Sequence, residues 1–192
     1  MRKKGKGSLP GESYSPAEMK TLLEQFNTRC LVPTRNKALA VVMWRCGLRC
    51  FEALALMPGD VADGIIRVLH GKGNKPRTVA IDPHGMQVLQ AWLDRKQKLG
   101  IGGPIFSTRQ GRPLQTSYVR QFLPRMAAKA GIAKRMHAHG LRHSCACDLA
   151  DEGQPLRVIS KVLGHASFAT TQTYLDHLGH GDVVDALKAR TW

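Results

Sequence analysis

Six polar side chains with the chemistry of phosphoryl transfer are spread through the chain. They comprise two guanidiniums, one ammonium, two imidazoles and one phenol. In chain order they are Arg49, Lys72, His139, Arg142, His165 and Tyr174. When a hydroxyl cleaves a phosphodiester, the nucleophile must lose its proton, the phosphorane oxygens must be stabilised and the leaving oxygen must gain a proton. A set of these types could meet all three needs.

Each residue type suits one of those needs. The phenol of Tyr174 has a pKa of about 10, low enough to be reached by nearby cations, and a phosphotyrosine remains labile enough to be reversed. Arginine offers a planar fork to phosphate oxygens and stays charged at any working pH. Arg142 follows His139 by three residues, so both project from one face of a helix start.

Taken singly, each residue has a structural interpretation: a solvated arginine, a hairpin lysine, a histidine at a helix end or a half-buried tyrosine. Their order and local contexts carry the functional interpretation. Those contexts are residues 47–52 (GLRCFE), 71–75 (GKGNK), 139–143 (HGLRH), 163–165 (LGH) and 170–174 (TTQTY). Together they resemble the catalytic domain of the tyrosine recombinases, the phage integrase and Xer-type family, from about Ser15 to Tyr174.

The resemblance implies a role for each residue. Tyr174 would attack the scissile phosphate and become linked to the 3′ end, while Arg49 and Arg142 would clamp that phosphate. His139 would handle the tyrosine proton, and Lys72 would be the general acid for the 5′ hydroxyl.

Further residues complete the expected site. His165 would donate a hydrogen bond to a phosphate oxygen, and Glu52 would hold the active-site cations in place. Lys75 is a rival to Lys72 as general acid. The residues expected to contact DNA are Arg2, Lys3, Lys4, Lys6, Lys75, Arg77 and His143. Neither a metal nor a nucleotide cofactor is expected, since the phosphotyrosine bond retains the energy for rejoining.

The charge of the chain favours a polyanionic partner. Its 192 residues contain 29 lysines and arginines against 14 aspartates and glutamates, a formal charge of +15. Such an excess favours nucleic acid, because each neutralised phosphate releases counterions, and a basic protein that binds no polyanion is the alternative. The resemblance implies that the nucleic acid is double-stranded DNA. The longest apolar stretch, Ala38 to Trp44, is far below the ~20 residues that cross a bilayer, and residues 1–10 do not form a secretory signal. A cytoplasmic, nucleoid-associated protein is expected.

The five cysteines favour reduced thiols over a disulfide framework, because their number is odd. A zinc site built from cysteines and histidines is an alternative, but the spacing fits no common zinc module. We expect mostly buried, reduced thiols.

The local signals predict a mainly α domain with a small three-stranded antiparallel sheet, an α+β fold. Ser15, Pro16 and Glu18 form a capping-box start, and Gly47 ends a second helix that starts near Thr34. The further helices are expected at 52–56, 83–99, 115–130, 139–151, 156–163, 168–177 and 182–190. The strands are expected at 65–69 and 78–81, with a possible third near 57–61.

Three segments follow from this pattern: a basic tail or linker at 1–14, the catalytic domain at 15–180 and a C-terminal helix at 181–192. Relatives usually carry a helical core-binding domain ahead of the catalytic one, and none is expected in this chain, because only about fourteen residues precede the first expected helix. The chain is therefore either an excised domain or a natural compact form, and we expect weak, salt-sensitive DNA binding.

The C-terminal helix folds back on its own domain or docks on a neighbour in a homotetramer on DNA. Without DNA we expect a monomer or a weak oligomer.

Three functions compete on the sequence. Site-specific recombination through a Holliday junction leads. A type IB topoisomerase uses nearly the same tyrosine chemistry, and a non-catalytic DNA-binding relative would not need Tyr174. Because no local code marks base-reading side chains, the sequence leaves open the DNA target and the choice between a phage, plasmid, transposon or chromosome-resolution role.

Overall fold

The helices begin and end where local capping groups place them. The computed structural model describes residues 13–69 and 76–164. In this part of the chain the helices are α1 (Pro16–Glu24), α2 (Leu31–Arg45), α3 (Cys50–Ala55), α4 (Pro83–Lys98), α5 (Thr116–Lys129), α6 (Ala138–Asp151) and α7 (Leu156–Leu163). The predicted capping box at Ser15 and Glu18 is confirmed, since each accepts a hydrogen bond from the other's main-chain N–H.

Helix α2 starts earlier than its sequence suggested. The start predicted near Thr34 is wrong, because the helix begins at Leu31 with Cys30 as its N-cap. Pro33 therefore lies in the first turn, where its missing N–H costs nothing since the first N–H groups of a helix have no intrahelical partner. Gly47 follows the C-cap with a φ of 59°, as the predicted helix end requires.

The predicted three-stranded antiparallel sheet is confirmed. It has the order β1 (Val61–Ala62), β2 (Ile65–Val68) and β3 (Arg77–Ala80), with Ile66 opposite Val79. The third strand predicted near 57–61 was placed too early. Residues Pro58–Asp60 form a 3₁₀ turn instead, because the Asp60 carboxylate accepts the N–H of Met57 at 2.8 Å.

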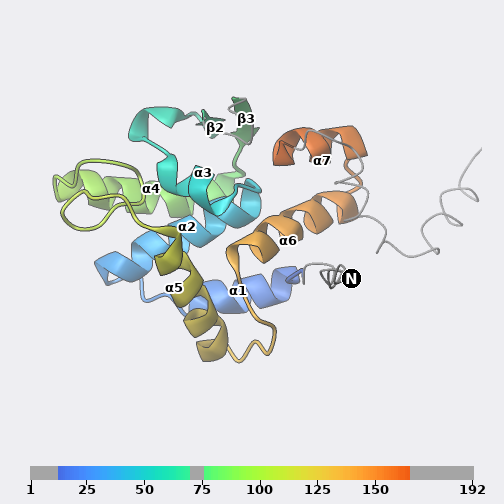
Figure 1. The fold of residues 1–192 in the computed structure, drawn as a ribbon, viewed down its shortest axis with the longest axis horizontal. Coiled ribbons are helices and arrows are strands. Elements are labelled where there is room, and N and C mark those ends of the chain that lie inside the picture. The colour runs from blue at the N-terminus through green and yellow to red at the C-terminus, as the bar shows by residue number, and fades with distance from the viewer. Residues whose placement is uncertain (1–12, 70–75, 165–192) are drawn as a thin grey trace, which may run out of the picture.

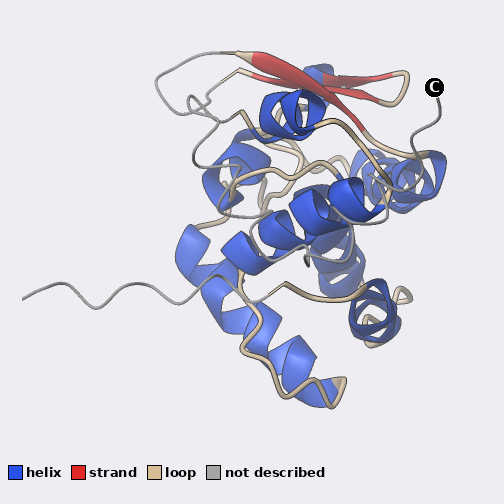
Figure 2. Cartoon of the chain, turned by 90° about the vertical axis from the view of Figure 1, so that its right-hand side faces the viewer, coloured by secondary structure: helices blue, strands red, loops and turns tan. Residues whose placement is uncertain are grey.

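The helices pack around α2, which contacts both α4 and α6 (Figure 1). The sheet lies at one edge of this helical body (Figure 2). The core is continuous from α1 through α5 to the sheet, and its largest fully buried side chains include Trp92, Tyr14, Phe106, Met19 and Leu39. Among the described helices, none has the length and apolarity needed to cross a bilayer.

Tyr14 belongs to this core, although the composition of residues 1–14 predicted a tail. Its side chain is 1% exposed. Its N–H donates to the Ser144 hydroxyl at 2.7 Å, and its own hydroxyl donates to the carbonyl of Arg135 at 2.9 Å. The local sequence pattern could not predict these contacts, because Ser144 and Arg135 are 130 and 121 residues away in the chain. The folded part of the chain therefore starts before residue 15.

The predicted helices at 168–177 and 182–190 lie outside the described residues.

Candidate active site

Arg49 and Glu52 form the first part of the site, at the turn between α2 and α3. Both oxygens of the Glu52 carboxylate contact Arg49: one accepts its main-chain N–H at 2.8 Å, and the other accepts Nη1 at 2.9 Å. The Glu52 side chain is 0% exposed, whereas that of Arg49 is 21% exposed. The carboxylate thus fixes the start of α3 and the direction of the Arg49 side chain together.

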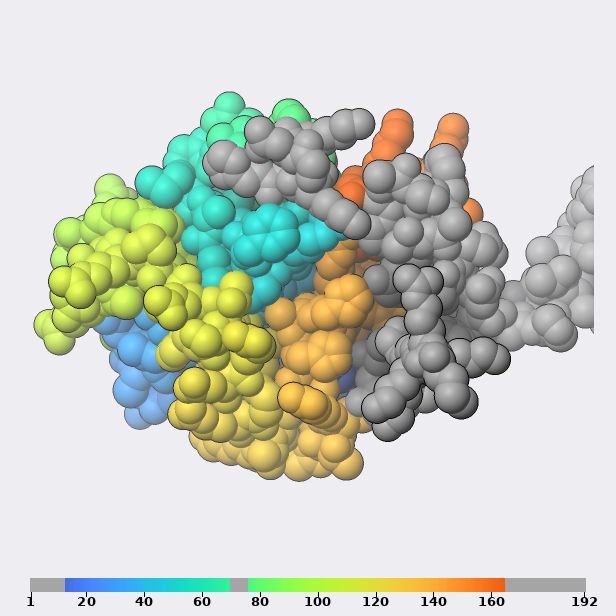
Figure 3. Space-filling model, in the orientation of Figure 1, coloured from blue at the N-terminus to red at the C-terminus, as the bar shows by residue number. Residues whose placement is uncertain are grey.

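Arg142 lies in the second turn of α6 and is buried, with 2% of its surface exposed. It donates to the carbonyl of Gly47 at 2.6 Å and to the carbonyl of Leu163. A Cβ on Gly47 would lie 2.8 Å from the Leu163 side chain, so a larger residue at 47 would force that side chain to shift. The close packing of three segments thus sets the position of this guanidinium. The surfaces of α3 and α6 adjoin on one face of the molecule (Figure 3).

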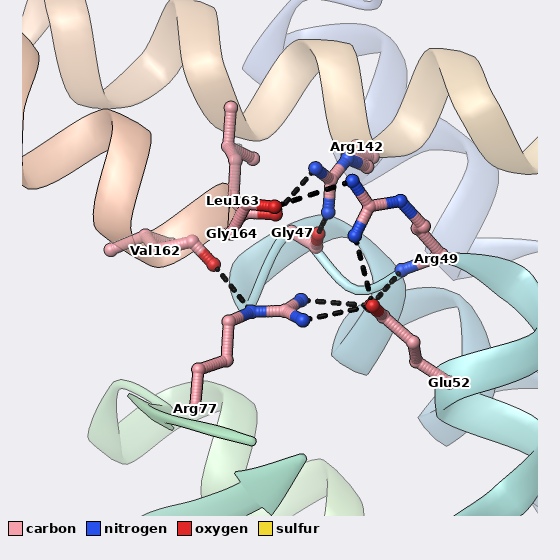
Figure 4. Close-up of polar contacts among 8 residues, drawn as sticks. All are labelled: Gly47, Arg49, Glu52, Arg77, Arg142, Val162, Leu163 and Gly164. Carbon is pink, nitrogen blue, oxygen red and sulfur yellow. Dashed lines mark hydrogen bonds and ion pairs between the residues drawn. The ribbon is translucent and has the colours of Figure 1, made fainter. Parts of the chain in front are cut away.

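The C-terminal end of α7 is the point where three arginines converge. Val162 accepts from Arg77 Nε at 3.1 Å, Leu163 accepts from Arg142, and the carbonyl of Gly164 lies 3.5 Å from Arg49 Nη2 (Figure 4). The last carbonyls of a helix have no intrahelical partner and carry a partial negative charge. The guanidiniums satisfy these groups, so the end of α7 is held in one place.

Arg77, at the start of β3, makes a bidentate pair with Glu52. Its Nη1 and Nη2 donate to the two carboxylate oxygens, each at 2.8 Å. The Arg77 side chain is 11% exposed. We expected this residue on DNA, and the structure instead directs its guanidinium into the protein, toward the carboxylate that also holds Arg49.

The charge state of Glu52 follows from these contacts. Burial alone would raise the pKa of its carboxyl group, but hydrogen bonds from Arg77 and from the main-chain N–H of Arg49 outweigh burial and lower that pKa. Glu52 is therefore ionised at neutral pH. The cluster of Arg49, Arg77, Arg142 and Glu52 holds three guanidiniums and one carboxylate, so it carries a net positive charge suited to a phosphate.

His139 lies in the first turn of α6, beside this cluster. Partial burial of the ring lowers its pKa, and electrostatic interactions with Arg142, His137 and Arg49 lower it further. The imidazole is therefore neutral at pH 7 and can accept a proton, as a base must.

His137 is a residue that the sequence analysis did not single out. It is the N-cap of α6, and its Nδ1 accepts the N–H of Gly140 at 2.9 Å. Its ring stacks on that of His139, with centroids 6.5 Å apart. Histidine is not among the usual N-cap residues, so the pattern of residue types offered no signal for this role.

The structure brings Arg49, Glu52, His139 and Arg142 to one place. His143, expected on DNA, is 4% exposed and lies in the interior because it falls on the core-facing side of α6. The other predicted site residues lie outside the described residues: Lys72, His165, Tyr174, Arg2, Lys3, Lys4, Lys6 and Lys75.

The five cysteines are free thiols, as predicted, and all fall in the described ranges. The prediction that most are buried is wrong, because Cys30 is exposed and Cys50 and Cys147 are only partly buried. Cys46 and Cys145 are buried, and burial raises the pKa of Cys145 to about 12, so this thiol is unreactive at neutral pH. Within residues 13–69 and 76–164, His, Cys, Asp and Glu side chains form no group of three or more that could hold a metal ion.

Comparison with known proteins agrees with this geometry. The model of the phage integrase family matches residues 13–180. The chain belongs to this family. Among family members, the tyrosine recombinase XerC of Azotobacter vinelandii is 38% identical over 146 residues, which cover 74% of this chain and 48% of that protein. XerC of Lactobacillus delbrueckii is 30% identical over 179 residues, 90% of this chain and 60% of that protein. The chain thus spans about half the length of the curated relatives it matches.

Solved structures of integrase family members share the fold. The XerA recombinase superposes with a TM-score of 0.80 at 29% identity, over 97% of this chain and 68% of that one. The XerH recombinase in its post-cleavage complex with the difH substrate gives a TM-score of 0.76 at 26% identity, over 94% of this chain and 54% of that one. The predicted fold, a mainly α catalytic domain with a small antiparallel sheet, is confirmed.

Proposed function

We propose that this chain is the catalytic part of a site-specific DNA recombinase. The observation that carries the proposal is the convergence of Arg49 and Arg142 at the end of α7, directly before His165 in the sequence, with His139 near enough for both arginines to lower its pKa. Two guanidiniums beside a neutral imidazole provide charge for phosphate oxygens and a site for a proton. This is the environment that phosphodiester cleavage needs.

The reaction proceeds through a covalent protein–DNA intermediate. The Tyr174 hydroxyl attacks the scissile phosphate, its proton passes to His139, and a bond forms between the tyrosine oxygen and phosphorus. The bond from phosphorus to the 5′ oxygen breaks, and Lys72 supplies the proton to that oxygen. Attack by the 5′ hydroxyl of a partner strand reverses these steps, and two such exchanges pass through a Holliday junction.

Arg49 and Arg142 stabilise the charge on the non-bridging phosphate oxygens during both steps. His165 donates to one of these oxygens, while Glu52 orients Arg49. Protein residues thus supply the base, the acid and the charge stabilisation, and no step requires a metal ion. Four protomers would assemble on paired DNA sites, and the solution mass of the DNA-bound adduct tests this assembly.

The first experiment tests covalent chemistry. The chain is incubated in EDTA with a nicked duplex that carries a candidate site from beside its gene, and the products are separated under denaturing conditions. We expect a protein–DNA adduct that Tyr174→Phe abolishes. Tyr118→Phe is the matched control, because Tyr118 bonds Arg35 and Asn36 in the structure and lies outside the proposed machinery. No adduct from the unaltered chain, or an adduct from Tyr174→Phe, would contradict the proposal.

The second experiment separates recombination from topoisomerase activity. A plasmid with two copies of the site is incubated with the protein. We expect a two-site product, either a deletion or an inversion. Relaxation of supercoils without such a product would instead indicate a type IB topoisomerase.

A further inference from the structure

Arg77 joins three parts of the site through a single side chain. It starts at β3, spans both oxygens of Glu52 on α3 and reaches the carbonyl of Val162 in the last turn of α7. All three guanidinium nitrogens donate a hydrogen bond. Its side chain thereby ties the hairpin strand β3 to both α3 and α7.

The side chain of Arg77 also lies against Gly164. A Cβ at Gly164 would meet Arg77 Cδ at 2.8 Å and Nε at 3.0 Å, so the arginine fills the space that a larger residue would occupy. Gly164 has a φ of 60°, the left-handed conformation that ends α7. The chain thus leaves α7 across the face of Arg77, immediately before His165.

Arg77 and Arg49 share the same carboxylate. Glu52 Oε1 accepts Nη1 from both arginines, and Oε2 accepts Arg77 Nη2 and the main-chain N–H of Arg49. Because Arg77 contacts both oxygens at 2.8 Å, it sets the plane of the carboxylate. The plane of the carboxylate in turn sets the direction in which Arg49 is held.

We propose that Arg77 is a positioning residue for DNA cleavage, which orients Arg49 through Glu52 and holds the end of α7 against the phosphate site. This inference rests on the proposed function. It assigns Arg77 an effect on the rate of cleavage and little effect on the affinity for DNA, because its guanidinium faces the protein.

The test compares Arg77→Gln with the unaltered full-length chain on the nicked duplex described above. Three quantities are measured: the single-turnover rate of adduct formation at saturating DNA, the Kd for the uncleaved duplex at several salt concentrations, and the urea midpoint. Arg77→Lys is the second variant, because it keeps a charge beside Glu52 and so protects folding. Arg67→Lys is the matched control on the same hairpin, where the exposed arginine bonds the carbonyl of Gly59.

We expect both Arg77 variants to slow adduct formation at saturating DNA by roughly 10- to 100-fold, with the larger loss for glutamine, because a displacement of about 1 Å at a reacting group can cost ~10²-fold. The Kd and its salt dependence should stay within about twofold of those of the unaltered chain, as expected for a residue that makes no phosphate contact. The Arg67→Lys rate should match that of the unaltered chain.

Two results would overturn the inference. If folded Arg77→Lys forms the adduct at the unaltered rate, the ion pair has a purely structural role. If the Kd weakens, the salt dependence becomes shallower and the saturated rate is retained, Arg77 contacts DNA instead. Failure of the proposed function is seen separately, because the unaltered chain would then form no adduct, and both proposals would fall.

Discussion

Two clusters of buried polar side chains handle their cations in different ways. The arginine cluster (Arg49, Arg77, Arg142, Glu52) places a fully buried carboxylate between two guanidiniums. The neutral cluster (Arg35, Asn36, Ser107, Tyr118) contains a guanidinium that is 5% exposed and donates to a carbonyl, an amide oxygen and a phenol. Burial lowers the pKa of Arg35, while Tyr118 offsets part of that effect.

The difference shows what each cluster is built to do. A single guanidinium needs acceptors for its N–H groups, and neutral groups on α2, α5 and the segment before it supply them. Gathering several guanidiniums also requires a countercharge, because like charges in one place repel. The buried carboxylate of Glu52 therefore supplies the countercharge that lets several guanidiniums gather, whereas the neutral cluster holds one guanidinium with neutral acceptors alone.

The largest effect is expected from Glu52→Gln, which removes the countercharge and keeps the shape of the side chain. Breaking a buried pair on one side costs about 3–5 kcal/mol, because the remaining charges lose their partner. We expect a loss of that size in the free energy of unfolding, measured with urea. Glu18→Gln is the matched control: Glu18 pairs with Lys134 at 2.9 Å but at the surface, so its loss should stay below about 1 kcal/mol. Equal losses of stability for the two variants would show that Glu52 is not a buried countercharge of special importance.

A smaller effect is expected from Arg35→Met in the neutral cluster. The substitution removes a buried charge and leaves the carbonyl of Ser107 without its Arg35 donor, at a cost of about 1–3 kcal/mol, while Asn36 and Tyr118 still bond each other. The rate of adduct formation per folded molecule should not change, because the hydrogen bonds of this cluster join α2, α5 and Ser107. Urea unfolding measures the loss of stability, and the adduct assay measures the rate. A slowed adduct rate would mean that the two clusters are coupled.

The smallest effect is expected from acid, which should reduce the contribution of Glu52 to the free energy of unfolding. The pKa of Glu52 is lowered in the folded protein, so this carboxylate contributes stability above its unfolded pKa of about 4.3, and that contribution is lost as pH falls through the lower, folded pKa. One group contributes at most about 1.4 kcal/mol per pH unit. We expect Glu52→Gln to flatten the fall in unfolding free energy below about pH 4. Arg35→Met should keep the slope of the unaltered chain, and an equal flattening in both variants would argue against Glu52 as the titrating group.

Local signals predicted most of the fold because they depend on neighbours in the chain. The capping box at Ser15, the helix ends at Gly47 and Gly164, and the hairpin strands all follow from short-range hydrogen bonds and φ preferences. The same signals failed at the starts of two elements: α2 begins at Leu31 after Cys30, which makes no side-chain cap, and the first strand begins at Val61 because Asp60 closes a 3₁₀ turn before it.

The sequence by itself determined the family, and the types and order of Arg49, His139 and Arg142 predict which residues carry the chemistry. Tertiary structure decided what those residues touch. Arg77 is paired with Glu52 and His143 is interior, while Tyr14 is part of the core. The physical reason is that a charged or polar side chain takes the partner that packing brings near, and for Arg77 those partners lie on α3 and α7, far from β3 in sequence.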